Sequence, residues 1–214
     1  LIFGPSGSGK EMVARAIHAA STRQTGPFVT LNAATITPER MEIELFGTES
    51  NGGERKVGAL EEAHGGILYL DEVADMPRET QGKIVRVLVD QQFERVGGTK
   101  RVKVDVRIIS STAQNLEMMI ADGRFREDLY HRLAVVPVLV PGLAERREDI
   151  PFLVDHFMRQ VAKQAGIKQR RLGDDALAVL QAHNWPGNIR QLRNNIERLM
   201  ILARGDDPDA PITA

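Results

Sequence analysis

The fold follows from Leu1-Ile2-Phe3-Gly4-Pro5-Ser6-Gly7-Ser8-Gly9-Lys10, a short apolar run that leads directly into a glycine-rich turn. Residues 10–20 carry apolar side chains at helical spacing, so the turn lies between a strand and a helix. It fits the pattern G-x-x-x-x-G-K, in which glycines let backbone amides curl around phosphate oxygens and the lysine neutralises the outer phosphates. The flanking strand and helix favour a nucleotide-binding loop over a glycine turn with a surface lysine.

Strands and helices alternate along the next part of the chain. Apolar runs predict strands at residues 28–31, 67–70, 106–111 and 135–140, and helical spacing predicts helices at 39–45 and 81–91. Gly97-Gly98 predicts a hairpin between residues 93–96 and 102–104, and the polar residues 47–58 predict a loop. This alternation predicts an α/β domain with a parallel sheet flanked by helices. Continuous apolar strands fit a sheet that is buried on both faces.

The character of the sequence changes near Gly142, beyond which only helices are predicted. We expect helices over residues 149–164, from an N-cap at Asp174, and from an N-cap at Asn188 to a stop at Gly205. The expected organisation is therefore an α/β domain over 1–141, an all-helical domain over 142–205 and a tail over 206–214. The tail is rich in Pro and Asp and is expected to be disordered.

Composition excludes several classes of function. The 214 residues include 28 Lys and Arg, 29 Asp and Glu, and no Cys, which gives a formal net charge of −1. Disulfides and thiolate catalysis are excluded, and the near-zero charge argues against a generally basic surface for nucleic acid. No apolar run reaches the length of a membrane span, and the five histidines have no metal-ligand spacing. We expect a cytoplasmic protein, part of a longer chain because the sequence begins inside a strand.

Two carboxylates follow the predicted strand at residues 67–70. In a parallel sheet, the end of this strand lies near the phosphate loop. We expect Asp71 to hold Mg²⁺ through water and Glu72 to polarise the attacking water. Glu11 stands after Lys10, where the general motif has Ser or Thr on magnesium. Its carboxylate either holds magnesium through water or faces solvent, and the residues alone favour the second interpretation.

Seven segments together resemble a known family. They follow the family's order over almost the whole chain: GPSGSGKE (4–11), FVTLN (28–32), ELFG (44–47), GGILYLDE (65–72), RVGG (95–98), GRFREDLYHRL (123–133) and WPGNIRQL (185–192). The chain resembles the central ATPase domain of bacterial enhancer-binding transcription regulators of the NtrC family, a branch of the AAA+ ATPases. The resemblance implies an AAA+ P-loop parallel sheet sandwiched by helices and followed by a small all-helical lid domain. It also implies ATP or ADP and Mg²⁺ as ligands.

The resemblance assigns roles to residues around the nucleotide of the same subunit. Lys10 matches the lysine that contacts the β- and γ-phosphates, and Asp71 and Glu72 match the residues that serve magnesium and water. Asn32 resembles the family's switch residue, which holds the catalytic glutamate according to nucleotide state. Thr112 stands at the sensor position. Glu11 is usual in the family after the loop lysine, so it does not argue against ATP.

Three arginines match residues that act on phosphate in the family. Arg126 and Arg132 match arginines that reach the ATP of a neighbouring subunit, and Arg190 matches the lid arginine of the same subunit. Positive charge is valuable there because negative charge builds up on the transferred phosphoryl group. The alternative for Arg126 and Arg132 is an ordinary surface ion pair with the interleaved Glu127 and Asp128.

One loop departs from the family. The family's Gly-Ala-Phe-Thr-Gly-Ala segment contacts the sigma-54 form of RNA polymerase, whereas residues 48–60 here read TESNGGERKVGAL and contain no Phe. We therefore expect no direct sigma-54 contact. The loop is similar to that of response regulators in nitrogen-related two-component systems. That resemblance implies a receiver domain before this segment and a DNA-binding domain after it, with a sensor histidine kinase and promoter DNA as partners.

Three hypotheses follow. The first is an ATP-binding AAA+ domain that controls transcription by nucleotide-dependent formation of homo-oligomers. The second is a non-hydrolysing, nucleotide-bound assembly module whose regulatory work lies in the receiver and DNA-binding domains. The third is a small-molecule kinase, which also has a phosphate loop and a lid. The pair Asp71-Glu72 and the arginines Arg126 and Arg132 favour hydrolysis over storage or transfer.

Overall fold

The computed structural model describes residues 1–50, 55–166, 168–202 and 211–213. Its contacts divide the chain into two compact units. The first contains Leu1–Phe3 and Lys10–Leu139, and the second contains Gly4–Gly9 and Val140–Ala214. The glycine-rich loop, which the sequence assigned to the α/β domain, thus groups with the helical unit. No helix among the described residues is long and apolar enough to cross a membrane.

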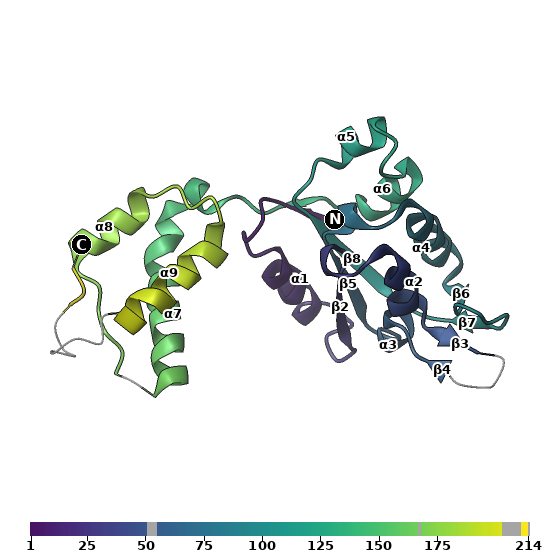
Figure 1. Ribbon diagram of the computed structural model, residues 1–214, viewed down its shortest axis with the longest axis horizontal. Helices are drawn as coiled ribbons and strands as arrows, with labels where there is room; N and C mark the ends of the chain where they lie inside the picture. Colours follow the sequence, from purple (N-terminus) through teal and green to yellow (C-terminus); the bar gives the residue numbers. More distant parts are fainter. Residues whose placement is uncertain (51–54, 167, 203–210, 214) are drawn as a thin grey trace. The chain divides into compact units, whose positions relative to one another are not determined.

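A five-stranded parallel sheet forms the centre of the first unit (Figure 1). Its strands lie in the order β2-β5-β8-β1-β9, and their bounds are β2 Phe28–Asn32, β5 Ile67–Asp71, β8 Arg107–Thr112, β1 Ile2–Phe3 and β9 Val138–Leu139. All neighbouring pairs are parallel, as the alternation of strands and helices predicts.

The predicted strands are found, with one shortened. Residues 67–70 are completely buried, which agrees with a central strand covered on both faces. The last strand is shorter than predicted, because Val135 and Val136 precede β9 and are exposed. The apolar run at residues 135–140 therefore predicts that a strand is present there, but it does not predict where β9 begins.

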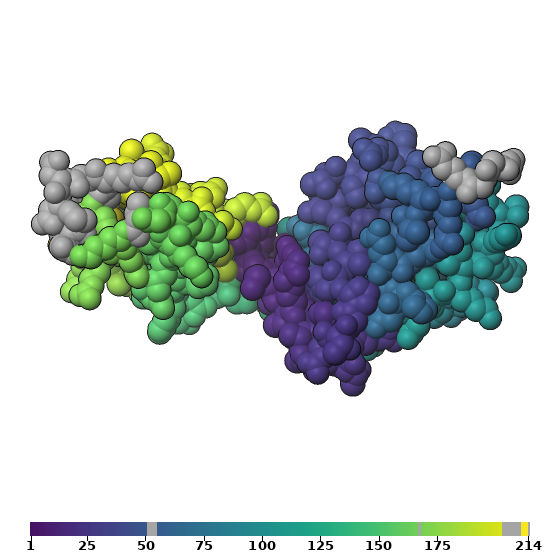
Figure 2. Space-filling view, turned by 90° about the horizontal axis from the view of Figure 1, so that it is seen from below, coloured from purple at the N-terminus to yellow at the C-terminus, as the bar shows by residue number. Residues whose placement is uncertain are grey.

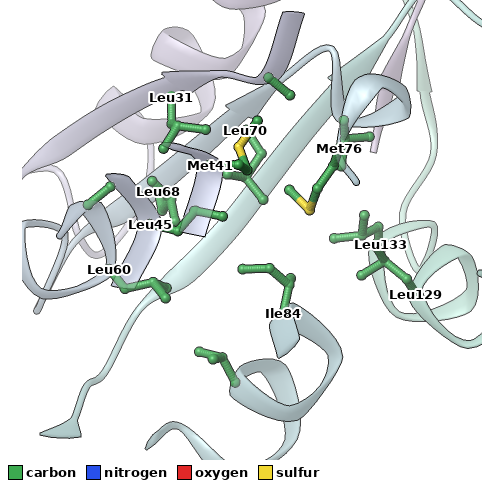
Figure 3. Close-up of a cluster of buried hydrophobic side chains, with 14 of the residues drawn as sticks. Leu31, Met41, Leu45, Leu60, Leu68, Leu70, Met76, Ile84, Leu129 and Leu133 are labelled. Atoms are coloured by element: carbon green, nitrogen blue, oxygen red, sulfur yellow. The ribbon is translucent and has the colours of Figure 1, made fainter. Parts of the chain in front are cut away.

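Helices cover the sheet. They are α1 Lys10–Ala19, α2 Pro38–Phe46, α3 Ala59–Glu62, α4 Arg78–Asp90, α5 Leu116–Ala121 and α6 Glu127–Leu133, with 3-10 turns η1 Ala33–Thr35 and η2 Val73–Asp75. Leu68 and Leu70 of β5 join α2, α3, α4 and α6 in one apolar cluster (Figure 3). Because strand side chains alternate between faces, Tyr69 points to the opposite face. There it stacks on Phe28, whose ring also lies under Arg15 of α1.

The region predicted as a loop, residues 47–58, contains a short antiparallel ladder. Strand β3 Thr48–Glu49 pairs with β4 Arg55–Lys56, and residues 51–54 lie outside the described part. A second ladder joins β6 Gln92–Glu94 to β7 Arg101–Lys103, as Gly97-Gly98 predicts. Its turn contacts the first ladder, because the amide of Glu49 donates to the carbonyl of Val96 at 3.0 Å. Each of these strands has only two residues and neither carries an apolar run, so the sequence pattern missed β3 and β4.

A buried arginine holds these ladders to α3. Arg95, 7% exposed, donates two hydrogen bonds of 2.8 Å to the two carboxylate oxygens of Glu61 and one of 2.9 Å to Glu49. These hydrogen bonds from Arg95 lower the pKa of the Glu61 carboxyl despite its partial burial. The pair stabilises the fold fully above the ordinary pKa of glutamate, and the contribution is lost as the pH falls through the lowered value.

Replacing Arg95 by Met is expected to lower the free energy of unfolding by about 3 kcal/mol, because Glu61 is left as a poorly compensated buried charge. Urea denaturation at neutral pH measures the loss. The control is Arg101→Met, because Arg101 is 71% exposed and lies 4.0 Å from Glu94. That change should stay within about 0.5 kcal/mol. Equal effects of the two substitutions would contradict the importance assigned to Arg95.

The second unit is helical. It contains η3 Leu143–Glu145, η4 Arg147–Asp149, α7 Ile150–Ala165, α8 Asp174–Ala182 and α9 Asn188–Leu202. Figure 2 shows one face of this unit, coloured green to yellow. Trp185 lies in its core at 4% exposure and donates from Nε1 to the carbonyl of Leu180 at 2.7 Å. The three helices predicted after Gly142 are therefore confirmed.

Two predicted helix caps differ from the structure. Asp174 is the first helical residue and Gly173 is the N-cap, while Asn188 is the first residue of α9 and has a positive φ of 49°. The Asn188 side chain accepts from the amide of Leu143 at 2.8 Å instead of capping its own helix. Of the predicted tail, the structure describes only residues 211–213, where Ile212 pairs with Leu172 and packs on the apolar core. The predicted stop at Gly205 lies outside the described residues.

Candidate functional site

The carboxyl ends of three adjacent strands bring polar side chains together. Asn32 at the end of β2 is in register with Asp71 at the end of β5, and Ser111 and Thr112 end β8 on the other side of β5. The apolar strands place these residues, because each strand runs through the core and emerges at the same edge of a parallel sheet. The predicted position of Asp71 at this edge agrees with the structure.

Asp71 is surrounded by hydrogen-bond donors. The amide of Asn32 donates from Nδ2 to Oδ2 at 2.9 Å, and the hydroxyl of Tyr69 lies 3.1 Å from Oδ1. The hydroxyl of Ser111 donates to the same Oδ1. A carboxylate held by neutral donors keeps its negative charge available for a hard cation such as Mg²⁺. These hydrogen bonds to Asp71 are therefore compatible with the magnesium role that the sequence predicts for it.

Sequence reasoning missed Tyr69 and Ser111. The signal for Tyr69 was present, because residues 69 and 71 of one strand point to the same face of the sheet. The signal for Ser111 required the register between β5 and β8, in which Leu70 lies opposite Ser110. Burial raises the pKa of the Tyr69 phenol far above its usual value, so the phenol is a hydrogen-bond donor at neutral pH.

Glu72 lies just beyond the strand, where the backbone turns. Its φ of 50° is left-handed, a conformation that costs a non-glycine residue about 1 kcal/mol or more and that clusters at functional sites. The carboxylate lies 3.3 Å from Nζ of Lys10 and accepts from the amide of Ala113 at 3.0 Å. The lysine and the glutamate that are predicted to act on one nucleotide, Lys10 and Glu72, therefore lie in contact in this structure.

Asn32, the predicted switch residue, contacts a different carboxylate from the one that the resemblance implies. Asn32 donates to Asp71, not to Glu72, and its Oδ1 accepts from the amide of Ala34 at 2.9 Å. The register explains this, because Asn32 lies directly beside Asp71 while Glu72 follows the turn out of the sheet. In this structure, Glu72 is instead held by Lys10 and by the backbone.

The glycine-rich loop is bound by the helical unit to which it belongs. The carbonyl of Gly7 accepts from the amide of Ile189 at 2.9 Å, and Nδ2 of Asn188 donates to the carbonyl of Ser6 at 2.9 Å. Gly7 and Gly9 have φ values of 76° and 99°, which favour glycine. Such backbone turns form concave sites for anions, in agreement with a phosphate loop.

The Gly7→Ala substitution is expected to lower nucleotide affinity at least tenfold. A Cβ on Gly7 would lie 2.4 Å from the carbonyl oxygen of Gly187, and its φ is unfavourable for alanine. Titration with a fluorescent nucleotide measures the affinity. Gly166→Ala is the matched control, because Gly166 also has a positive φ but a Cβ there meets nothing within 4 Å. Similar affinities for the two variants would contradict a role for Gly7 in the loop.

Of the three predicted phosphate arginines, Arg132 and Arg190 are exposed, and Arg126 is partly buried. Arg126 precedes α6 and forms two hydrogen bonds with Asp128, at 2.9 and 2.7 Å. Those bonds raise the pKa of the Arg126 guanidinium, which stays charged in either case. Arg132 lies in the last turn of α6. Nη1 of Arg190 lies 3.5 Å from Oγ of Ser6, so this arginine already touches the loop.

Two further predicted residues have local partners. Oγ1 of Thr112 accepts from the amide of Gln114 at 3.0 Å, at the end of β8 that carries Ser111. Glu11 forms an ion pair of 2.7 Å with Arg15, and both side chains are about half exposed. The solvent-facing interpretation of Glu11 therefore describes its position in this structure.

Comparison with known proteins shows which families the chain matches. Residues 1–139 match the family described as Sigma-54 interaction domain, and residues 144–210 match the family described as AAA+ ATPase lid domain. The chain is 67% identical to the nitrogen assimilation regulatory protein NtrX of Azorhizobium caulinodans, over 100% of this chain and 47% of that protein. It is 48% identical to the DNA-binding transcriptional regulator NtrC of Escherichia coli strain K12, over 97% and 45%. The chain thus spans about half the length of these curated relatives.

Solved structures show the same fold. A crystal structure of NtrX from Brucella abortus superposes with a TM-score of 0.96 at 82% identity, covering 100% of this chain and 49% of that one. Two further structures of the Brucella protein, one in complex with ADP and one with ATP, each have a TM-score of 0.94 at 80% identity and cover 100% of this chain and 47% of theirs.

Proposed function

Since the chain belongs to the Sigma-54 interaction domain family, with an AAA+ fold and an AAA+ lid, we propose that it binds and hydrolyses ATP with Mg²⁺. The observation that carries this proposal is the side-chain arrangement at the end of β5. Asp71 is held by donors on both oxygens, and Glu72 lies 3.3 Å from Lys10. The ADP and ATP complexes of the Brucella relative support the choice of nucleotide.

Each residue has a separate task in this proposal. Lys10 neutralises the outer phosphates, and the release of its ion pair with Glu72 leaves that carboxylate able to accept a proton from water. Asp71 would hold Mg²⁺ through water, and the ion would withdraw charge from the phosphate oxygens. Thr112 is the candidate sensor and Asn32 the candidate switch residue, which acts through its bond to Asp71.

Hydrolysis also requires charge from a second subunit. We assign this task to Arg126, the partly buried N-cap residue of α6, and to Arg132, which is exposed in its last turn. Arg126 must then exchange Asp128 for a phosphate, an exchange that guanidinium geometry allows because both partners are bidentate acceptors. Arg190 serves the nucleotide of its own subunit from the lid. The assembly implied is a homo-oligomer with its active sites shared between neighbours.

The output is transcription control through nucleotide-dependent self-association. NtrX and NtrC are regulatory proteins by name, and we propose the same class of activity for the protein that contains this chain. Promoter DNA and a cognate sensor histidine kinase would act through parts outside this segment. Residues 48–60 contain no Gly-Ala-Phe-Thr-Gly-Ala segment, so we propose no direct contact with sigma-54 RNA polymerase.

A second candidate is a nucleotide-bound assembly module that does not hydrolyse ATP. The observation in its favour is that the catalytic candidates are occupied: Glu72 by Lys10 and the amide of Ala113, and Arg126 by Asp128. The presence of Glu72, a carboxylate suited to polarising water, argues against the assembly module, because storage of a nucleotide needs no general base.

Binding and turnover are separable by experiment. The purified protein is titrated with fluorescent ATP and ADP in the presence of Mg²⁺, and phosphate release is followed in parallel. The proposal predicts saturable binding that Lys10→Ala weakens, together with phosphate release. Binding without release would support the assembly module, and no binding of either nucleotide would contradict both candidates.

A further inference from the structure

We propose that Tyr69 and Ser111 are positioning residues that fix the carboxylate of Asp71 for magnesium. The inference rests on the proposed function, in which Asp71 serves the metal. It extends that function to two buried hydroxyls on neighbouring strands. Neither hydroxyl belongs to the phosphate loop, to the carboxylate pair or to the candidate arginines.

The two hydroxyls and the carboxylate form a closed cluster. Tyr69 and Ser111 are completely buried, and their oxygens lie 2.8 Å apart. Both oxygens also contact Oδ1 of Asp71, the phenol at 3.1 Å. Each hydroxyl has one proton to donate. The serine donates to Oδ1 of Asp71, and the phenol donates either to the same Oδ1 or to the serine oxygen.

The opposite side of the carboxylate has a different environment. Oδ2 of Asp71 accepts one hydrogen bond, from Asn32 on β2. Each carboxylate oxygen can accept about two hydrogen bonds, so Oδ2 retains acceptor capacity on the side away from Tyr69 and Ser111. Asn32 on β2 and Ser111 on β8 donate to the carboxylate directly, and Tyr69 on β5 donates to it or to Ser111. These contacts fix the plane of the carboxylate and direct Oδ2 toward a ligand. Fixing a metal-serving group in this way strengthens metal affinity.

A purely packing role does not explain the hydroxyls. Burying a hydroxyl is costly unless a partner compensates, and phenylalanine and alanine would fill the same positions without that cost. The neighbouring Ser110 provides the contrast. Its Oγ is buried and has no hydrogen-bond partner among the described residues, so its hydroxyl acts on no carboxylate. Ser110 and Ser111 therefore form a matched pair that differs in contact with Asp71.

The test measures magnesium dependence of nucleotide binding in Tyr69→Phe, Ser111→Ala, the double variant and the control Ser110→Ala. Each protein is titrated with a fluorescent ADP, first with EDTA and then at increasing Mg²⁺. We expect affinity in EDTA to stay unchanged. The Mg²⁺ concentration for half-maximal effect should rise about tenfold or more in Ser111→Ala and in the double variant. Tyr69→Phe should have a smaller effect, because the serine still donates.

The outcomes are distinct. An unchanged magnesium midpoint in Ser111→Ala and the double variant would overturn the inference. So would an equal loss of affinity in EDTA and in Mg²⁺, because that pattern indicates a structural role, as would an equal shift in Ser110→Ala. Thermal unfolding identifies a variant that fails to fold, and Ser111→Thr, which retains a hydroxyl, should then restore the midpoint. Absence of nucleotide binding in the unmodified protein would instead contradict the proposed function itself.

Discussion

Glu72→Gln is expected to slow ATP hydrolysis by roughly 10²–10⁴-fold, the usual contribution of a general base. Glutamine has nearly the same shape and can still accept from the amide of Ala113, but it cannot take a proton from water. Nucleotide affinity should be retained or increased, because Lys10 loses its ion pair with residue 72 and becomes available to phosphate. Phosphate release and a nucleotide titration on the same preparation measure both quantities.

The matched control for Glu72→Gln is Glu79→Gln. Glu79 is 81% exposed and lies 3.9 Å from Lys83, so this change also removes a carboxylate from a lysine but at the surface. It should leave turnover unchanged. Equal rates for the unmodified protein and Glu72→Gln would contradict a role for Glu72 as general base.

Arg126→Ala and Arg132→Ala are each expected to reduce turnover by about 10³-fold or more, the effect of removing an arginine that stabilises phosphoryl transfer. Each subunit's own nucleotide affinity should change little, because these arginines act on the neighbouring site. The matched control is Arg124→Ala, an exposed arginine of the same segment that pairs with Asp122 at 3.0 Å. Turnover that survives in Arg126→Ala would support the ordinary surface ion pair with Asp128.

Mixing two inactive variants tests whether the arginine acts between subunits. A subunit with Arg126→Ala retains Lys10, and a subunit with Lys10→Ala retains Arg126. A complete site forms in a ring where the Lys10→Ala subunit supplies Arg126 to the nucleotide site of a neighbouring Arg126→Ala subunit. In a random mixture of equal amounts, this arrangement occurs at roughly a quarter of the interfaces. We expect the mixture to recover a corresponding fraction of the activity. No recovery would indicate that both residues act within one subunit.

The α/β fold and most of its strands could be predicted from sequence because the responsible signals are local. The run at residues 67–70 and the glycine turn before Lys10 each indicate their element without information from elsewhere in the chain. The same signals predicted the positions of Asp71 and Glu72, and the resemblance to the AAA+ family is confirmed by the matches over both parts of the chain.

The features that sequence reasoning missed depend on pairing between distant segments. Ser111 meets Asp71 only through the register of β5 and β8, and Asn32 meets Asp71 instead of Glu72 through the register of β2 and β5. Asparagine is a common N-cap residue, but the side chain of Asn188 forms hydrogen bonds with the backbone of Leu143 and of the phosphate loop. In each case a polar side chain forms a tertiary contact that its local sequence does not predict.

Sharing of active sites between subunits is tested by the rate of ATP hydrolysis per subunit over a wide range of protein concentration, with Glu72→Gln as the blank. If active sites are shared between neighbours, the rate per subunit rises with concentration and reaches a plateau when assembly is complete. A plateau that Arg126→Ala abolishes would support the account fully. A rate that is independent of concentration, or that does not exceed the Glu72→Gln blank, would contradict it.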